Sequence, residues 1–132
     1  MKKSLKFKEP RTRKSWVKLL DDLVRKAVYA RDGYRSVKSG KTENLNPSHI
    51  YPKGRYIRMR WLVDNILTLT WDEHLNWWHK NPIEASEWFN EKYPERAKKL
   101  KLISQLNYKT KIDYEAEKLY LENEIKKHED RI

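Results

Sequence analysis

The feature that most constrains the fold is the stretch at residues 48–79, where two short apolar segments flank a basic loop and precede a tryptophan-rich segment. Residues 45–51 have the pattern of a short strand, and residues 66–69 that of a second, buried strand. Residues 52–64 form the basic loop between them, and residues 70–80 are expected to be helical. This order predicts a small unit of two strands and a helix inside a larger fold.

Helical patterns surround this unit. Residues 15–32 carry apolar side chains at helical spacing, and Ser15 is the expected N-cap. Asn81, Pro82 and Glu84 have the pattern of a helix start with a capping box. The predicted fold class is α+β, mainly helical, with a small ββα core, an N-terminal helix and C-terminal helices. The later helices are expected at residues 82–92, 94–106 and 111–127.

The chain is strongly basic. Its 132 residues include 30 Lys and Arg against 19 Asp and Glu, which gives a net charge of +11. Such an excess favours a polyanionic partner, although a merely soluble basic protein would have the same composition. The charge is concentrated in residues 1–14, where seven Lys or Arg face only Glu9. This arm is expected to follow a phosphate backbone or to be a disordered, solubilising tail.

The chain divides into a basic arm at 1–14, a main domain at 15–106 with its ββα core at about 45–80, and a C-terminal helical extension at 107–132. The last helix has only a thin apolar stripe, so we expect it to form a homodimer with a partner chain or to project into solvent. The sequence contains no apolar run of membrane-spanning length and no secretory signal pattern. A cytoplasmic protein without a membrane partner is therefore expected.

Three residues of the core have the chemistry of phosphodiester hydrolysis if they meet in space. His49 closes the first strand and can act as a general base near pH 7. His74 lies early in the following helix, where its imidazole can hold a divalent metal ion. Asn65 opens the second strand and can tie down the loop after His49. Each residue alone is more often structural, but their order and spacing together favour a catalytic site.

The order of these residues resembles the motif of the HNH endonuclease family, whose fold is called ββα-metal. The resemblance is carried by Ser48 and His49, by the segment Asp-Asn-Ile-Leu-Thr-Leu at 64–69 and by His74. It is nearest to the small phage group that includes NinG-type recombination proteins, and it covers about residues 30–90.

This resemblance implies a metal-dependent endonuclease that hydrolyses DNA phosphodiester bonds. His49 would be the general base, Asn65 the structural asparagine of the catalytic set, and His74 a metal ligand. A phage-encoded protein of this kind would act in the cytoplasm of the host cell.

The expected metal site departs from the family pattern. Many relatives have an Asp before the base histidine, where this chain has Ser48, and a hydroxyl is a poor metal ligand. The ion, expected to be Mg²⁺ or Mn²⁺ with Zn²⁺ as an alternative, would then depend on His74, water and substrate phosphate. His79 is a second candidate ligand, but five residues along an α-helix place it about 140° around the helix from His74. A phosphate contact or a structural role is the alternative for His79.

Many relatives also carry a structural zinc ion on two Cys-x-x-Cys pairs. The corresponding positions here are Ser36, Ser39, Thr70 and Glu73, and the chain has no cysteine, so a Cys₄ zinc site is excluded. Because such an ion contributes folding free energy, something must replace it. We expect tryptophans to do so, those at positions 61, 71, 77, 78 and 88.

The basic loop carries Lys53, Arg55, Arg58 and Arg60, which are expected to bind DNA through its phosphates unless the loop is merely solvated. No base-reading pattern is present, so weak sequence specificity or a structure-specific substrate is expected. The alternative function is a catalytically degenerate HNH-like module that binds nucleic acid, as the missing Asp and cysteines suggest. A third interpretation, a phage structural or packaging protein without a nucleic-acid site, is disfavoured by the net charge.

Overall fold

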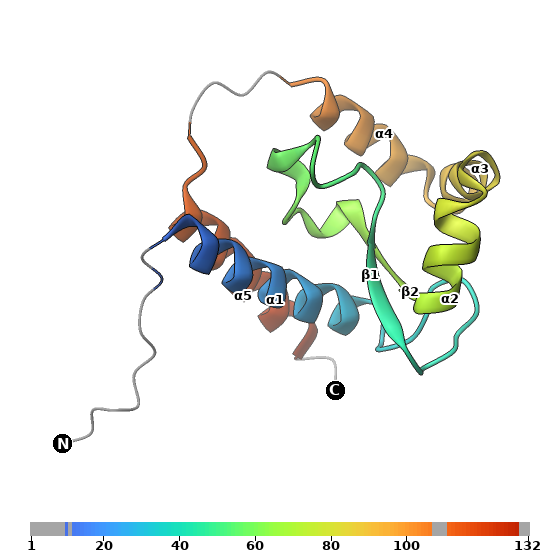
Figure 1. The fold of residues 1–132 in the computed structure, drawn as a ribbon, viewed down its shortest axis with the longest axis horizontal. Helices are drawn as coiled ribbons and strands as arrows, with labels where there is room; N and C mark the ends of the chain where they lie inside the picture. Colours follow the sequence, from blue (N-terminus) through green and yellow to red (C-terminus); the bar gives the residue numbers. More distant parts are fainter. Residues whose placement is uncertain (1–9, 11, 107–110, 130–132) are drawn as a thin grey trace.

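The computed structural model describes residue 10, residues 12–106 and residues 111–129. Most of the predicted arm, and both ends of the predicted extension at 107–132, lie outside these residues. Figure 1 shows a mainly helical molecule with one small sheet, as the α+β prediction requires. No described helix has the length and apolar character needed to cross a membrane. In chain order the elements are α1 (Arg13–Arg31), β1 (Leu45–His49), η1 (Ile57–Met59), η2 (Val63–Asn65), β2 (Ile66–Thr70), α2 (Trp71–Glu73), η3 (His74–His79), α3 (Pro82–Lys92), α4 (Pro94–Ser104) and α5 (Tyr114–Glu129).

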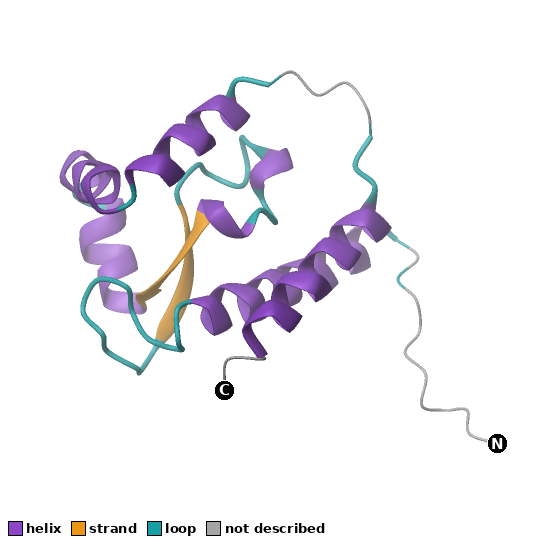
Figure 2. Ribbon diagram, turned by 180° about the vertical axis from the view of Figure 1, so that it is seen from behind, coloured by secondary structure: helices purple, strands orange, loops and turns teal. Residues whose placement is uncertain are grey.

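The two predicted strands are present and pair antiparallel, with Leu45 opposite Thr70 and His49 opposite Ile66. All five residues of β2 are buried, which explains why Ile66, Leu67 and Leu69 follow one another so closely and the two polar residues are threonines. Figure 2 shows the strands between the α1–α5 pair and the helices that follow β2. The pairing places the end of β1, with His49, beside the start of β2.

The N-cap of helix α1 lies three residues before the predicted one. Thr12 is the N-cap, and its hydroxyl accepts a hydrogen bond from the Ser15 backbone nitrogen at 3.0 Å. Ser15 stands at the third helical position and its hydroxyl accepts from the Thr12 nitrogen, so the two residues form a capping box. Arg13 and Lys14 therefore belong to the helix and not to the arm. The predicted apolar stripe is confirmed, because its central residues are buried, namely Leu20, Val24, Ala27 and Val28.

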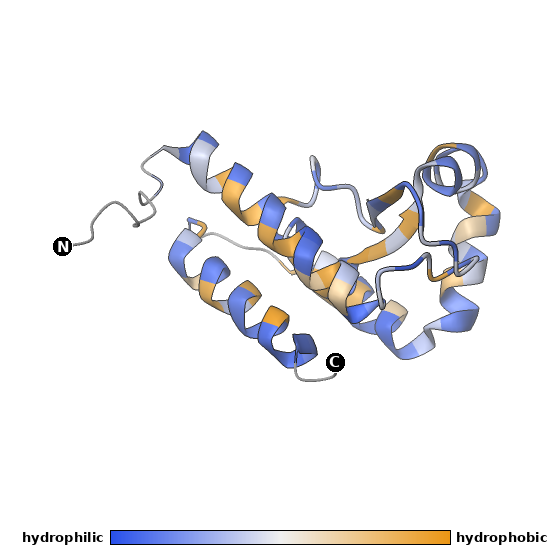
Figure 3. Ribbon diagram, turned by 90° about the horizontal axis from the view of Figure 1, so that it is seen from below, coloured by the Kyte–Doolittle hydropathy of each residue, from blue (hydrophilic) through white to orange (hydrophobic). Residues whose placement is uncertain are grey.

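Helix α5 packs along α1 within the same chain. Figure 3 shows the two helices side by side with apolar residues along both. Leu121 is fully buried, and Tyr120 and Ile125 pack against the same core as Trp61 and Val63. The helix therefore does not simply project into solvent. Its stripe is used inside the chain, so this packing gives no support to the homodimer, which stays a prediction.

Helices α3 and α4 close the other side of the sheet. Phe89 and Leu100 are buried there together with Met59 and two residues of β2. Pro82 occupies the first helical position, as predicted. The predicted capping box is wrong: Asn81 makes no side-chain cap, and Glu84 instead accepts a hydrogen bond from Trp77 at 3.3 Å.

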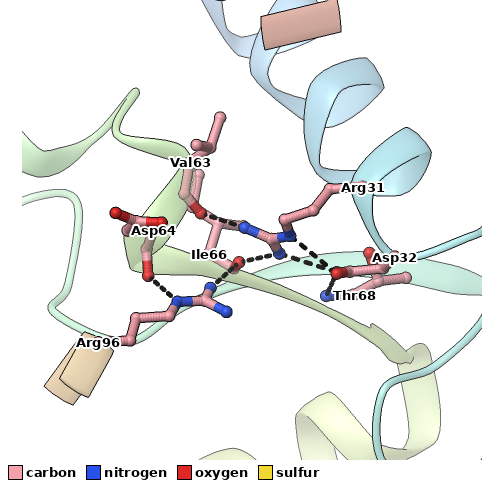
Figure 4. Close-up of polar contacts among 7 residues, drawn as sticks. All are labelled: Arg31, Asp32, Val63, Asp64, Ile66, Thr68 and Arg96. Carbon is pink, nitrogen blue, oxygen red and sulfur yellow. Dashed lines mark hydrogen bonds and ion pairs between the residues drawn. The ribbon is translucent and has the colours of Figure 1, made fainter. Parts of the chain in front are cut away.

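Two arginines hold the backbone around the turn η2 (Figure 4). Arg31 donates to the carbonyls of Val63 and Ile66, both at 2.6 Å. Arg96 donates to the carbonyl of Asp64 at 2.7 Å and also to that of Ile66 at 2.9 Å. Arg31 comes from α1 and Arg96 from α4, so side chains from both sides of the sheet fix this turn.

The charges of the two arginines are balanced differently. Asp32 accepts two hydrogen bonds from Arg31, each 2.8 Å long, and one from the Thr68 backbone nitrogen. The Arg96 guanidinium lies over the ring of Tyr93, 5.0 Å from its centroid. Burial, followed by the charge of Arg31, lowers the pKa of Arg96 to about 10. Arg96 therefore stays charged near pH 7.

Candidate functional site

His49 has one ring nitrogen engaged and one that can accept a proton. Its Nε2 lies 2.9 Å from the carbonyl oxygen of Arg60. Because a carbonyl only accepts hydrogen bonds, Nε2 carries the proton and Nδ1 keeps its lone pair. Burial, helped by the charges of Lys53 and Arg60, lowers the pKa of His49 below its usual 6.5. The side chain is therefore neutral near pH 7, in the form that a general base requires.

Arg60 has a role besides the one predicted. Its guanidinium forms an ion pair with Asp21 of α1, with Nη2 2.7 Å and Nε 2.9 Å from the two carboxylate oxygens. Trp61 donates to the same carboxylate at 2.9 Å. The pair orients the Arg60 backbone, whose carbonyl holds His49. Arg60 thus positions His49 through its carbonyl while its guanidinium is paired with Asp21, and its contact with a phosphate stays a prediction.

Asn65 ties the loop down, as its position predicted. The side chain is fully buried. Its Oδ1 accepts from the Tyr51 backbone nitrogen at 2.9 Å, and its Nδ2 donates to the carbonyls of Tyr51 and Met59, both at 3.0 Å. One amide thereby joins the start and the end of the loop that follows His49.

His74 is held by the residue that stands in place of the family's Asp. The hydroxyl of Ser48, which is fully buried, lies 2.8 Å from His74 Nδ1. Burial, followed by the charges of His79 and His49, lowers the pKa of His74. The Trp78 indole, four residues after His74, donates to the His49 carbonyl at 3.0 Å, so the turn after β2 lies along the end of β1 that carries Ser48 and His49. Ser48 therefore orients the His74 ring.

The turn η3 brings His79 to His74. Their Nε2 atoms are 3.0 Å apart, and the rings are nearly perpendicular. The predicted offset of about 140° assumed an α-helix. Residues 74–79 form a π-helical turn instead, whose hydrogen bonds link each residue to the fifth along and bring residues at this spacing together. No signal in the sequence identified this widening.

The histidine pair fits a metal ion that accepts nitrogen ligands. A separation of 3.0 Å is that of two neighbouring ligands on one ion with nitrogen-to-metal distances of about 2.0–2.1 Å. Both Nε2 atoms offer lone pairs when His74 carries its proton on Nδ1 and donates it to Ser48. The described residues include no group of three or more His, Cys, Asp or Glu side chains that could hold a metal. Imidazoles suit Zn²⁺, whereas Mg²⁺ and Mn²⁺ prefer oxygen ligands, so this donor set fits Zn²⁺ best.

The other predicted DNA contacts differ in exposure. Lys53 and Arg55 are exposed, and the charge of Lys53 acts on His49. Arg58 is half-buried and interacts electrostatically with Glu117 of α5. Lys53 and Arg55 are therefore the members of this set best placed to reach a phosphate.

The four positions aligned with the zinc cysteines meet in a hydrogen-bond network. Ser36 donates to the Glu73 carboxylate at 2.6 Å, and the Thr70 backbone nitrogen donates to the same oxygen at 2.9 Å. The Glu73 nitrogen in turn donates to the Thr70 hydroxyl. Burial alone would raise the pKa of Glu73, but hydrogen bonds from Ser36, Ser39 and Thr70 outweigh burial and lower it. A carboxylate thus joins the two segments.

The tryptophans lie around this network and not within it, and Trp77 reaches its first segment, with the Lys38 ammonium 4.6 Å from the Trp77 ring centroid. Trp61 packs in the core between α1 and α5. Trp77, Trp78 and Trp88 pack with the second core beside α3 and α4. Trp71 is 52 % exposed. Hydroxyl–carboxylate contacts therefore join the two segments in which the HNH resemblance would place zinc-binding cysteines.

Replacing Glu73 with alanine is expected to lower the free energy of unfolding by about 1–3 kcal/mol at pH 7, because Ser36 and Thr70 lose their acceptor. The lowered pKa means that this stability is present above the unfolded-state pKa, near 4.5, and is lost as pH falls through the folded-state value. Urea unfolding at pH 7 and pH 3 measures both effects. The exposed Glu87→Ala is the control, and an equal loss at both pH values would contradict the network.

No family model, no curated protein and no solved structure matches the chain. The resemblance to the HNH family therefore depends on the short motif alone. The site itself offers a neutral, half-buried histidine with a proton-accepting nitrogen, a pair of imidazoles suited to a metal ion, and exposed cations nearby.

Proposed function

We propose that the protein is a metal-dependent endonuclease of the HNH type that hydrolyses DNA phosphodiester bonds. The observation that carries this proposal is the state of His49, which is half-buried, neutral and fixed through Nε2 so that Nδ1 can take a proton. Hydrolysis needs such a base, because water is a weak nucleophile until its proton is removed.

In the proposed reaction, His49 Nδ1 accepts a proton from a water molecule as the water oxygen attacks phosphorus. The bond from phosphorus to the 3′-oxygen breaks, and that oxygen leaves and takes up a proton from solvent. His74 and His79 would hold the ion, with Ser48 fixing the His74 ring. When bound, a divalent ion supplies stabilisation for the negative charge that develops on the phosphate and the leaving oxygen.

The surrounding charge suits DNA as substrate. Lys53 and Arg55 are exposed on the loop that Asn65 anchors, so they can contact phosphates near His49. Arg60 contributes to the site through its carbonyl, which holds His49. The contacts of Lys53 and Arg55 would be to the DNA phosphates, and cleavage is therefore expected to depend weakly on base sequence.

A plasmid-nicking assay with purified protein tests this function. We expect no nicking in EDTA and recovery with Zn²⁺ more readily than with Mn²⁺ or Mg²⁺, because the two protein ligands are nitrogens. Replacing His79 with alanine is expected to raise the metal concentration needed for half-maximal nicking by at least about tenfold.

The fourth histidine, His128 in α5, provides the matched control, and His128→Ala is expected to leave the metal requirement unchanged. Nicking that persists in EDTA would contradict the proposal. The absence of a third metal-binding side chain among the described residues favours one alternative, the degenerate DNA-binding module. DNA binding without nicking under every ion would support that module.

A further inference from the structure

Trp71 is exposed beside the candidate site. It follows the buried strand β2 directly, yet 52 % of its surface is exposed. Its ring stacks on His74, with centroids 5.5 Å apart and planes 23° from parallel. A large aromatic side chain kept in water next to a candidate catalytic group is a platform on which another flat ring can stack.

The same side chain lines a hollow of about 830 Å³ between residues 40–45 and residues 70–76. Leu75 adds to its apolar wall, and Lys41 stands on its other side. The Trp71 backbone nitrogen donates a hydrogen bond to the Asn44 carbonyl at 2.7 Å. This bond fixes the two rims of the hollow relative to each other. Asn44 itself has a φ of 52°, a left-handed conformation that this contact holds in place. The hollow is therefore a built feature of the fold and is large enough for a nucleobase.

The lining favours a base over a phosphate group. Glu43 and Asp72 both face the hollow, and their carboxylates repel a phosphate. Carboxylate and amide groups pair instead with the amino groups on the edges of adenine, cytosine and guanine. Asn44 and Asn76 supply such amides in the same lining.

We infer that this hollow receives one unpaired nucleobase, which stacks on Trp71 and presents an amino-bearing edge to Asp72 or Glu43. The inference rests on the proposed function, since it places the base next to the phosphate to be cut. In a regular duplex both faces of every base are covered by its neighbours. The preferred substrate is therefore DNA with a base outside the stack, such as a bulge.

The test measures binding in EDTA with the His49→Ala protein, so that nothing is cut. The two probes are a fluorescently labelled DNA hairpin with one extrahelical adenine and the same hairpin fully paired. Fluorescence anisotropy is expected to show tighter binding of the bulged probe, by about fivefold to 100-fold, the range that base–aromatic stacking supplies. Adding Trp71→Ala is expected to remove this preference, whereas Trp71→Phe keeps most of it. An extrahelical thymine, which lacks an amino group, is expected to bind less tightly than adenine.

Leu102→Ala is the matched control, because Leu102 is also an exposed apolar residue, 67 % exposed, but lies on α4. Trp71→Ala that weakens both probes equally would overturn the inference, as would equal binding of both probes by the starting protein. If plasmid nicking is observed in those cases, the proposed function stands and only the base site falls. If neither probe binds, both the base site and the proposed function are contradicted. If the protein never nicks DNA but prefers the bulged probe through Trp71, the base site is supported and the proposed endonuclease activity is contradicted.

Discussion

Replacing His49 with alanine is expected to slow DNA nicking by about two to four orders of magnitude, the contribution typical of a positioned general base. The variant loses the Nδ1 that accepts the proton, while Lys53, Arg55 and the histidine pair stay in place. DNA binding in EDTA is therefore expected to change little. Single-turnover nicking rates and anisotropy titrations measure the two properties separately.

The pH profile gives the same prediction an independent check. Burial lowers the pKa of His49 below 6.5, so the neutral base persists into mildly acidic solution. Nicking is expected to rise with pH through a midpoint below 6.5 and then to level off. Nicking by the His49→Ala protein at the wild-type rate, or a wild-type midpoint above 6.5, would contradict the assignment.

Replacing Asn65 with alanine is expected to lower the free energy of unfolding by about 3–4 kcal/mol. The amide makes three hydrogen bonds to the backbone of Tyr51 and Met59, and it is fully buried. Without it, those backbone groups lose their partner in a site closed to water. A small domain is stable by only about 5–15 kcal/mol, so the loss is a large fraction of the total.

Urea unfolding monitored by circular dichroism measures the effect of Asn65→Ala. Asn76→Ala is the matched control, because Asn76 is exposed and its side chain donates a hydrogen bond to Asp72, a neighbour on the same turn. That variant is expected to change the free energy of unfolding by less than about 0.5 kcal/mol. A similar loss in both variants would show that Asn65 does not anchor the loop.

The elements that could be predicted from sequence are those in which local pattern and burial agree. Strand β2 is buried at every position and carries Ile66, Leu67 and Leu69 because both of its faces are covered, and α1 carries its apolar stripe because one face meets the core. Asn65 was also predictable, since an amide at the entry to a buried strand must find backbone partners. In each case one short segment contains the whole signal.

The features that were missed depend on contacts between distant segments. The π-helical turn has no marker in residues 74–79, so the approach of His79 to His74 could not be foreseen. Arg60 looked like a phosphate contact because its partner, Asp21, lies 39 residues earlier. Pairings of this length are decided by the tertiary fold.

Assembly of the site has a consequence for the order in which the protein matures during synthesis. The Val63 backbone nitrogen, at the start of the turn that contains Asn65, donates to the Tyr120 hydroxyl on α5. Leu121 of the same helix completes the core around α1. A ribosome-bound chain that ends before α5 therefore lacks part of the support for its histidines. The proposed nicking activity is therefore expected only after α5 has left the exit tunnel, so that nascent chains would not nick nearby nucleic acid.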